Sequence, residues 1–102
     1  MLKEAALAII VCAELARESH TGYWIQDCAA ATENILIEAK HLGIGSVWLG
    51  IHPREDRVAG IKKLFNLPEK IMPLSLVSIG YPAEEKRPSD RYDESRIHIN
   101  KW

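Results

Sequence analysis

Long apolar runs alternate with amphipathic stretches along this chain. Residues 5–12 form the first run, which ends in β-branched side chains without alternation, as expected of a central strand covered on both faces. A helix beginning almost at the terminus is the alternative. Residues 46–51 and 72–81 are predicted to form two further strands, because both are short, apolar and bounded by turn-forming residues.

Between residues 23 and 42 the apolar positions recur at helical spacing. A second stripe flanks the first, so the predicted helix has a wider apolar surface than contact with one sheet requires. Gly43 is expected to end it, since glycine is the common residue just past a helix C-terminus. The first stripe comprises Trp24, Cys28, Ala31, Ile35, Ala39 and Leu42, and the second comprises Ile25, Ala29, Thr32 and Leu36.

A shorter helix is expected directly after His52-Pro53, because proline suits the first turn of a helix. Acidic residues near its start and lysines near its end match the helix dipole. Asn66-Leu67-Pro68 is expected to stop it. The resulting order β-α-β-α-β predicts an α/β or α+β sandwich around one small sheet.

The last twenty residues, 83–102, differ in character from the rest of the chain. They are charged and rich in turn-forming residues, yet they carry the large apolar side chains Tyr92, Ile97, Ile99 and Trp102. An unattached tail rarely carries so many apolar anchors. We therefore predict a single domain over residues 1–102, with 83–102 as a C-terminal tail that docks on another surface.

Composition narrows the class of protein. The chain of 102 residues is 47% hydrophobic and 26% charged, the balance of one soluble domain. Its net charge of -1 argues against nucleic acid as a partner. The apolar run 5–13 is too short to span a membrane. We expect a cytoplasmic protein in which Cys12 and Cys28 are reduced, buried thiols.

The glycine turn at residues 43–48 invites comparison with a dinucleotide-binding loop. Trp48 stands where the third glycine belongs, and the segment leaves a helix to enter a strand, opposite to a phosphate loop. A helix cap followed by a tight turn is the preferred interpretation, and a small nucleotide-binding domain is a minor alternative. The sequence contains no GxSxG, HExxH or paired CxxC motif. The main support for a hydrolase or for a zinc site is therefore missing.

Trp48-Leu49-Gly50 is the segment with the strongest binding signal. A bulky residue followed by glycine at a strand end lets a planar ligand approach the main chain, where exposed N–H groups can hydrogen-bond it. Packing in a core or an interface is the alternative for the tryptophan.

Several phrases, taken in order, resemble the FMN-dependent nitroreductase family. No single phrase is decisive, but their succession is specific and covers nearly the whole chain. The resemblance implies an α+β fold with a mixed sheet flanked by helices, of which this chain would hold the C-terminal part. The phrases lie at residues 23–36, 42–50, 67–69, 80–82 and 90–96.

The resemblance also implies an activity and an assembly. Family members are intertwined homodimers with FMN at the subunit interface, in which NAD(P)H reduces the flavin and a nitroaromatic or quinone then accepts the electrons. The wide apolar helix would supply the dimer contact, and the tail would wrap across the partner.

Carried over to this chain, the resemblance places Trp48, Leu49 and Gly50 along the isoalloxazine, with backbone amides near its N5 and O4 edge. Arg96, preceded by Ser95, matches the C-terminal arginine that pairs with the FMN phosphate. Arg91 is a weaker candidate for that contact. No side chain is assigned a catalytic or metal-binding role.

One departure from the family pattern concerns the start of the chain. Family members begin with a further segment that carries a phosphate motif and an asparagine-containing loop, and we expect that flavin-binding segment to be absent here. The alternative to an oxidoreductase is therefore a truncated, non-catalytic dimerisation or interaction domain that has lost FMN.

Overall fold

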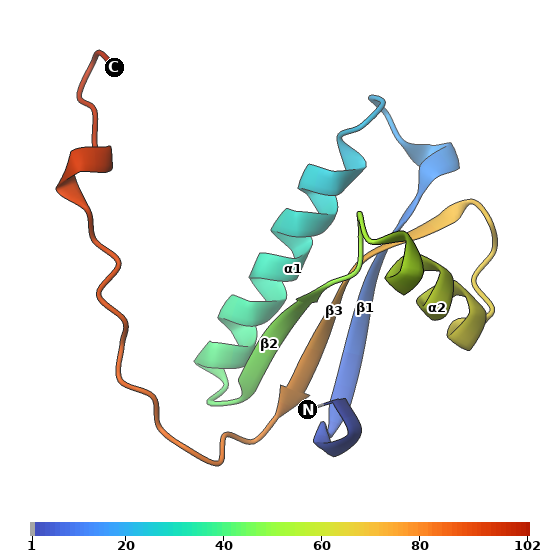
Figure 1. Cartoon of the computed structure of the whole chain (residues 1–102), viewed down its shortest axis with the longest axis horizontal. Coiled ribbons are helices and arrows are strands. Elements are labelled where there is room, and N and C mark those ends of the chain that lie inside the picture. Colours follow the sequence, from blue (N-terminus) through green and yellow to red (C-terminus); the bar gives the residue numbers. More distant parts are fainter. Residues whose placement is uncertain (1) are drawn as a thin grey trace.

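The computed structural model describes residues 2–102 and contains one sheet flanked by two helices (Figure 1). The α+β class and the order β-α-β-α-β are confirmed. Short 3-10 turns also occur, two before α1 and one in the tail. The main elements are β1 (Leu7–Glu14), α1 (Trp24–His41), β2 (Gly45–Gly50), α2 (Glu55–Phe65) and β3 (Ile71–Gly80).

The sheet has the order β1-β3-β2, and both pairings are antiparallel. The prediction of a central strand at residues 5–12 is therefore wrong: β1 is an edge strand of this sheet, and β3 is central. Residues 73–78 of β3 are all buried, whereas β1 is exposed at its start and half-buried beyond. The mixed pairing implied by the family resemblance is not seen in residues 2–102, because β1 and β2 each pair antiparallel with β3.

The two helices cover opposite faces of the sheet. Side chains of directly paired residues lie on the same face, and neighbours along a strand alternate. Ser75 of β3 touches Thr32 of α1, so its face belongs to α1. Leu76 lines a hollow with Ile61 of α2, so the alternate residues face α2.

Helix α1 packs through a face that differs slightly from the predicted stripe. Cys28 and Ala39 are buried as expected, but Ala31 and Leu42 are exposed and Thr32 is fully buried. The face centred on residues 28, 32 and 39 follows the spacing i, i+4, i+11, so it combines Cys28 and Ala39 of the first predicted stripe with Thr32 of the second. The exposed Ile25, Ile37 and Leu42 confirm that α1 has more apolar surface than the sheet covers.

The ends of both helices follow from local backbone geometry. Gly43 has a φ of 72°, which glycine adopts at little cost, and α1 ends just before it as predicted. Helix α2 ends at Phe65 and is followed by Asn66, whose φ is 49°. Its start differs from the prediction: Pro53 lies in the preceding turn, and the extended Arg54 is the residue before the first helical position.

A buried pair of hydroxyl groups joins α1 to the central strand. Thr32 Oγ1 donates to the Cys28 carbonyl at 2.7 Å and lies 2.8 Å from Ser75 Oγ. Because the threonine proton points at Cys28, the Ser75 hydroxyl is the donor between the two side chains. Both residues are fully buried.

Replacing Thr32 with valine should lower the free energy of unfolding by about 1–3 kcal/mol, because the buried Ser75 hydroxyl loses its partner. Urea denaturation followed by circular dichroism measures this. The double variant Thr32→Val, Ser75→Ala is the control, and it should be more stable than Thr32→Val alone because no polar group is left unmatched. A double variant that is less stable by the sum of the two single effects would contradict the pairing.

The two cysteines are free thiols, Cys12 on β1 and Cys28 on α1. Cys28 is buried as predicted, whereas Cys12 is only half-buried. Burial raises the pKa of Cys28, and the Asp27 carboxylate raises it further. Burial also raises the pKa of Cys12, with Cys28 as the second cause.

Both thiols should therefore be slow to alkylate in the native protein. A raised pKa means a smaller thiolate fraction at any given pH, so the rate with iodoacetamide should rise at higher pH in the folded chain than in urea. Mass spectrometry after timed quenching, at pH 7 to 10 with and without urea, gives both profiles. Coincident profiles would show that burial does not protect these thiols.

The C-terminal tail runs away from the sheet and helices (Figure 1). Its large apolar residues Tyr92, Ile97, Ile99 and Trp102 are all exposed, Trp102 completely. The radius of gyration is 16.5 Å, whereas a compact chain of this length has roughly 13 Å. The apolar anchors thus find no partner surface on the described part of their own chain.

Within residues 2–102, no helix combines the length and apolar character needed to cross a membrane.

Candidate functional site

Strand β2 forms one edge of the sheet. It pairs with β3 on one side, and no other strand of the described residues pairs with its other side. An edge strand directs every second backbone N–H and C=O away from its neighbour. The predicted ligand segment, residues 48–50, lies on this strand.

The hydrogen-bond pattern identifies which amides of β2 face outward. The Ile51 amide donates to the Leu74 carbonyl at 3.0 Å, which makes these directly opposed residues a hydrogen-bonded pair. In an antiparallel ladder such pairs alternate, so Leu49 also bonds with its partner on β3. The N–H and C=O groups of Trp48 and Gly50 therefore point to the free edge.

This alternation divides the predicted tripeptide. The N–H and C=O groups of Leu49 point toward β3. Its side chain points toward α2, where it lines a hollow. Trp48 and Gly50 lie on the α1 face, opposite Val77 and Ser75. We refer to the outward backbone groups of Trp48 and Gly50 as the β2 free edge.

The α1 face of β2 is open at Gly50. A Cβ atom placed on Gly50 meets no atom within 4 Å. Trp48 is 37% exposed, so part of its ring remains available for contact. A flat ligand therefore has room to lie against the main chain at this glycine. Packing within the fold does not require glycine at this position, because a side chain would meet no atom at its Cβ.

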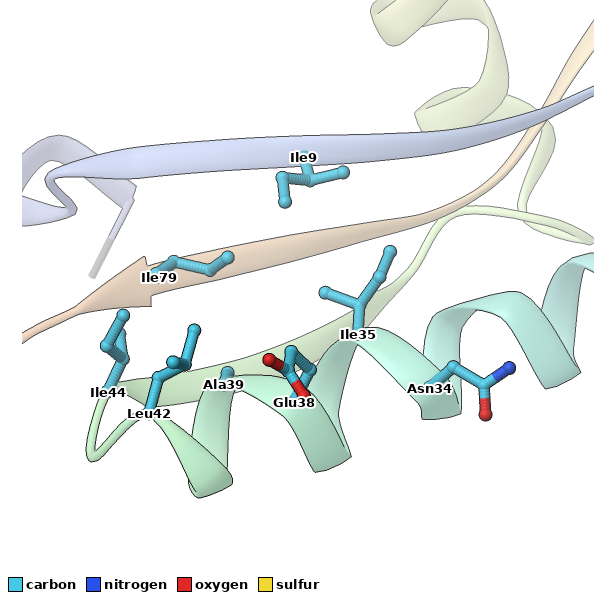
Figure 2. Close-up of a pocket in the computed structure, with 8 residues that line it drawn as sticks. All are labelled: Ile9, Asn34, Ile35, Glu38, Ala39, Leu42, Ile44 and Ile79. Atoms are coloured by element: carbon cyan, nitrogen blue, oxygen red, sulfur yellow. The ribbon is translucent and has the colours of Figure 1, made fainter.

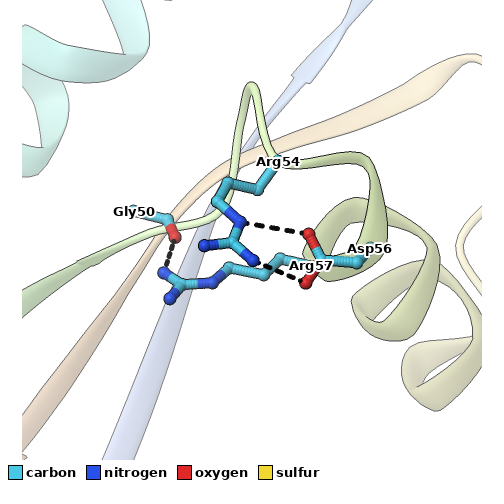
Figure 3. Close-up of polar contacts among 4 residues, drawn as sticks. All are labelled: Gly50, Arg54, Asp56 and Arg57. Carbon is cyan, nitrogen blue, oxygen red and sulfur yellow. Dashed lines mark hydrogen bonds and ion pairs between the residues drawn. The ribbon is translucent and has the colours of Figure 1, made fainter.

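Two arginines of the α2 N-terminal region lie next to this edge (Figure 3). Arg57 Nη1 donates to the Gly50 carbonyl at 2.7 Å. Arg54 instead makes a two-point contact with Asp56, at 3.1 and 3.0 Å. The hydrogen bond from Arg54 lowers the pKa of the Asp56 carboxyl, and the same contact raises the pKa of Arg54. Sequence reasoning did not single out either arginine.

The predicted phosphate-binding residues are on the tail, far from β2 in the same chain (Figure 1). Ser95 and Arg96 belong to the short 3-10 helix Glu94–Arg96. Arg96 Nε lies 3.1 Å from Asp93 Oδ2, and the Ser95 hydroxyl donates to Asp93 Oδ1 at 2.6 Å. The Arg96 side chain is 84% exposed, so the contact with Asp93 is a weak restraint. Arg91 is exposed on the same tail.

A hollow of about 410 Å³ lies between α1 and the sheet (Figure 2). Aliphatic side chains from both sides point toward one another in it, whereas Asn34 points away. Glu38 is its only ionisable lining residue. The hollow therefore offers apolar contact and no acid–base pair. Its lining residues are Ile9, Asn34, Ile35, Glu38, Ala39, Leu42, Ile44 and Ile79.

A second hollow, of about 370 Å³, lies beneath α2 on the opposite face. Arg57 lines it, and so does Leu49, so the hollow reaches the back of β2. In residues 2–102, no group of three or more His, Cys, Asp or Glu side chains is placed to hold a metal ion.

Comparison with known proteins places this geometry in a family. Residues 1–81 match the family model described as the Nitroreductase family. A protein of Methanothermobacter thermautotrophicus, provisionally named NADH dehydrogenase/NAD(P)H nitroreductase, is 49% identical over 102 residues, which are all of this chain and 53% of that protein.

Solved structures of related proteins have the same fold as this chain. One from Clostridium acetobutylicum, provisionally named an NADH oxidase, superimposes with a TM-score of 0.93 at 46% identity, over 98% of this chain and 61% of that one. An FMN-dependent nitroreductase from Clostridium difficile gives a TM-score of 0.88 at 29% identity, over 98% and 60%. The chain thus spans 53% to 61% of the length of the curated relatives it matches most fully.

Proposed function

Because the chain belongs to the nitroreductase family, we propose that it forms part of an FMN-dependent oxidoreductase that uses NAD(P)H. The acceptors would be nitroaromatic or quinone-type compounds, and the protein would work in the cytoplasm. The observation that carries the proposal is the β2 free edge, which offers outward N–H donors at Trp48 and Gly50 next to the open α1 face of Gly50.

The residues present fit the ring of FMN. The N5 and O4 atoms on one edge of an oxidised isoalloxazine are hydrogen-bond acceptors, and the β2 free edge supplies donors on a main chain that carries no side chain of its own at Gly50. Trp48 would add apolar contact. Leu49 would support the segment from behind, because its own amide is held by β3.

Bound FMN supplies the electron-transfer chemistry, which no side chain of this chain replaces. The role of the chain is to bind and orient the ring. Backbone donors fixed in a strand keep their direction without the entropy loss of ordering a mobile side chain, so they hold one edge of a planar ligand in a defined position.

We further propose that the complete site needs a second copy of the chain. Ser95 and Arg96 lie away from β2 in their own chain, on a tail whose apolar residues are exposed. A homodimer in which each tail crosses the partner would bury Tyr92, Ile97, Ile99 and Trp102 and bring an arginine to the phosphate of FMN. The exposed Ile25, Ile37 and Leu42 of α1 offer a second contact surface for that dimer.

Titration with FMN, followed by quenching of flavin fluorescence at several protein concentrations, tests this function. We expect saturable binding that becomes tighter as protein concentration raises the dimer fraction, followed by NADH oxidation in the presence of a quinone. The exposed apolar residues of α1 and of the tail favour a second candidate, a non-catalytic dimerisation domain. Dimerisation without FMN binding at any concentration would support that second candidate and contradict the first.

A further inference from the structure

The side chain of Arg57 reaches from the first turn of α2 back to the end of β2. Its Nη1 atom donates to the Gly50 carbonyl at 2.7 Å (Figure 3). That carbonyl points outward from the sheet on the same side as the Gly50 N–H, because both groups of an edge residue share a direction. The Arg57 guanidinium therefore hydrogen-bonds the Gly50 carbonyl oxygen, which is the acceptor next to the outward Gly50 N–H.

The neighbouring arginine provides an internal contrast. Both guanidinium contacts of Arg54 go to the Asp56 carboxylate, so this charge is balanced locally. Arg57 has no carboxylate partner within 4 Å among residues 2–102, and its side chain instead hydrogen-bonds the Gly50 carbonyl. Two arginines three positions apart thus have different surroundings.

A bare strand edge presents both N–H and C=O groups, and another strand can pair with it. At Gly50 the C=O is already taken, so this end of the β2 free edge presents donors alone: the backbone N–H and the remaining guanidinium N–H groups. A ligand edge made only of acceptors matches such a row. An incoming strand does not match it, because its own N–H needs the carbonyl.

We propose that Arg57 is a positioning residue that occupies the Gly50 carbonyl, so that this end of the β2 free edge selects an acceptor-only ligand edge and rejects strand pairing. The selection of the flavin N5 and O4 edge rests on the proposed function. The rejection of strand pairing does not, because it needs no ligand.

Three variants test this proposal: Arg57→Met removes the donor and the charge, Arg57→Lys keeps both, and Arg54→Met is the matched control on the same turn. The first readout is the Gly50 carbonyl ¹³C chemical shift of the ligand-free chain, which should move upfield in Arg57→Met and return toward its original value in Arg57→Lys. Arg54→Met should leave it unchanged. Circular dichroism verifies that each variant is folded.

The second and third readouts are association and FMN affinity. Sedimentation should show Arg57→Met forming larger species than the unmodified chain at equal concentration. Its Kd for FMN should rise about fivefold, as expected for loss of one charge-assisted hydrogen bond at an exposed site. Arg57→Lys should recover part of both properties.

The outcomes separate the two proposals. An unmoved Gly50 carbonyl shift in Arg57→Met, or unchanged association, would overturn the role of Arg57 in blocking strand pairing. Unchanged FMN affinity in Arg57→Met, where the unmodified chain binds FMN, would overturn its role in ligand selection. Failure of the unmodified chain to bind FMN would refute the flavin site and with it that selection, while the carbonyl shift and sedimentation would still decide whether Arg57 blocks strand pairing.

Discussion

Gly50→Val is expected to abolish FMN binding, raising the Kd at least about 100-fold, while the chain stays folded. The added side chain would stand on the α1 face of β2, in the space where the ring must approach the main chain. The same position accepts a Cβ without any contact inside 4 Å, and valine suits a strand, so we expect the variant to stay folded. Fluorescence quenching gives the affinity, and thermal unfolding gives the stability.

Gly60→Val is the matched control for this substitution. Gly60 lies on α2, and a Cβ there also meets no atom within 4 Å, but the residue is not on the β2 free edge. Its variant should bind FMN as the unmodified chain does. Equal FMN affinity for Gly50→Val and the unmodified chain would place the ring elsewhere.

Arg96→Ala should weaken binding of FMN by about 10- to 100-fold and leave binding of riboflavin unchanged. Riboflavin carries the same ring without the phosphate, so the difference between the two ligands isolates the anion contact. The guanidinium is released easily, because its bond to Asp93 is exposed. Arg87→Ala removes another tail arginine outside the matched motif and should affect neither ligand.

A mixing experiment locates the second copy's contribution. In a heterodimer of Gly50→Val and Arg96→Ala chains, one site combines an intact β2 edge with an intact tail from the other subunit. Random pairing of equal amounts should therefore restore FMN binding at roughly a quarter of the sites. If the tail served its own chain, no site would be restored in the mixture. For the single variant, an equal loss of riboflavin and FMN affinity in Arg96→Ala would show that Arg96 does not bind the phosphate.

Local sequence patterns predicted the helices and strands well, because the formation of each element depends mainly on residues that are close together in the sequence. The helical spacing of residues 23–42 and the glycine after it gave α1 nearly to the residue, and Gly50 marked the open strand. Non-local pairing was harder to predict. The apolar run of β1 suggested a central strand, whereas the order β1-β3-β2 arises from pairing between segments distant in sequence.

The details of the candidate site depend on the same non-local register. Which amides of residues 48–50 face outward follows only from the pairing of Ile51 with Leu74. Arg57 is seven residues from Gly50, and only the turn before α2 brings its side chain back to that carbonyl. The helical pattern placed Thr32 in its second stripe, but its pairing with Ser75 joins segments that are distant in sequence and could not be predicted from it. Where Ser95 and Arg96 act remains a prediction.

The most direct test of the β2 free edge is a ¹⁵N-resolved NMR titration of the chain with FMN. We predict that the amide protons of Gly50 and Trp48 shift downfield as they gain an acceptor, while the Leu49 amide, already bonded to β3, keeps its shift and its slow exchange with solvent. Saturable FMN binding with the Gly50 and Trp48 amides unmoved would show that the flavin does not bind at this edge.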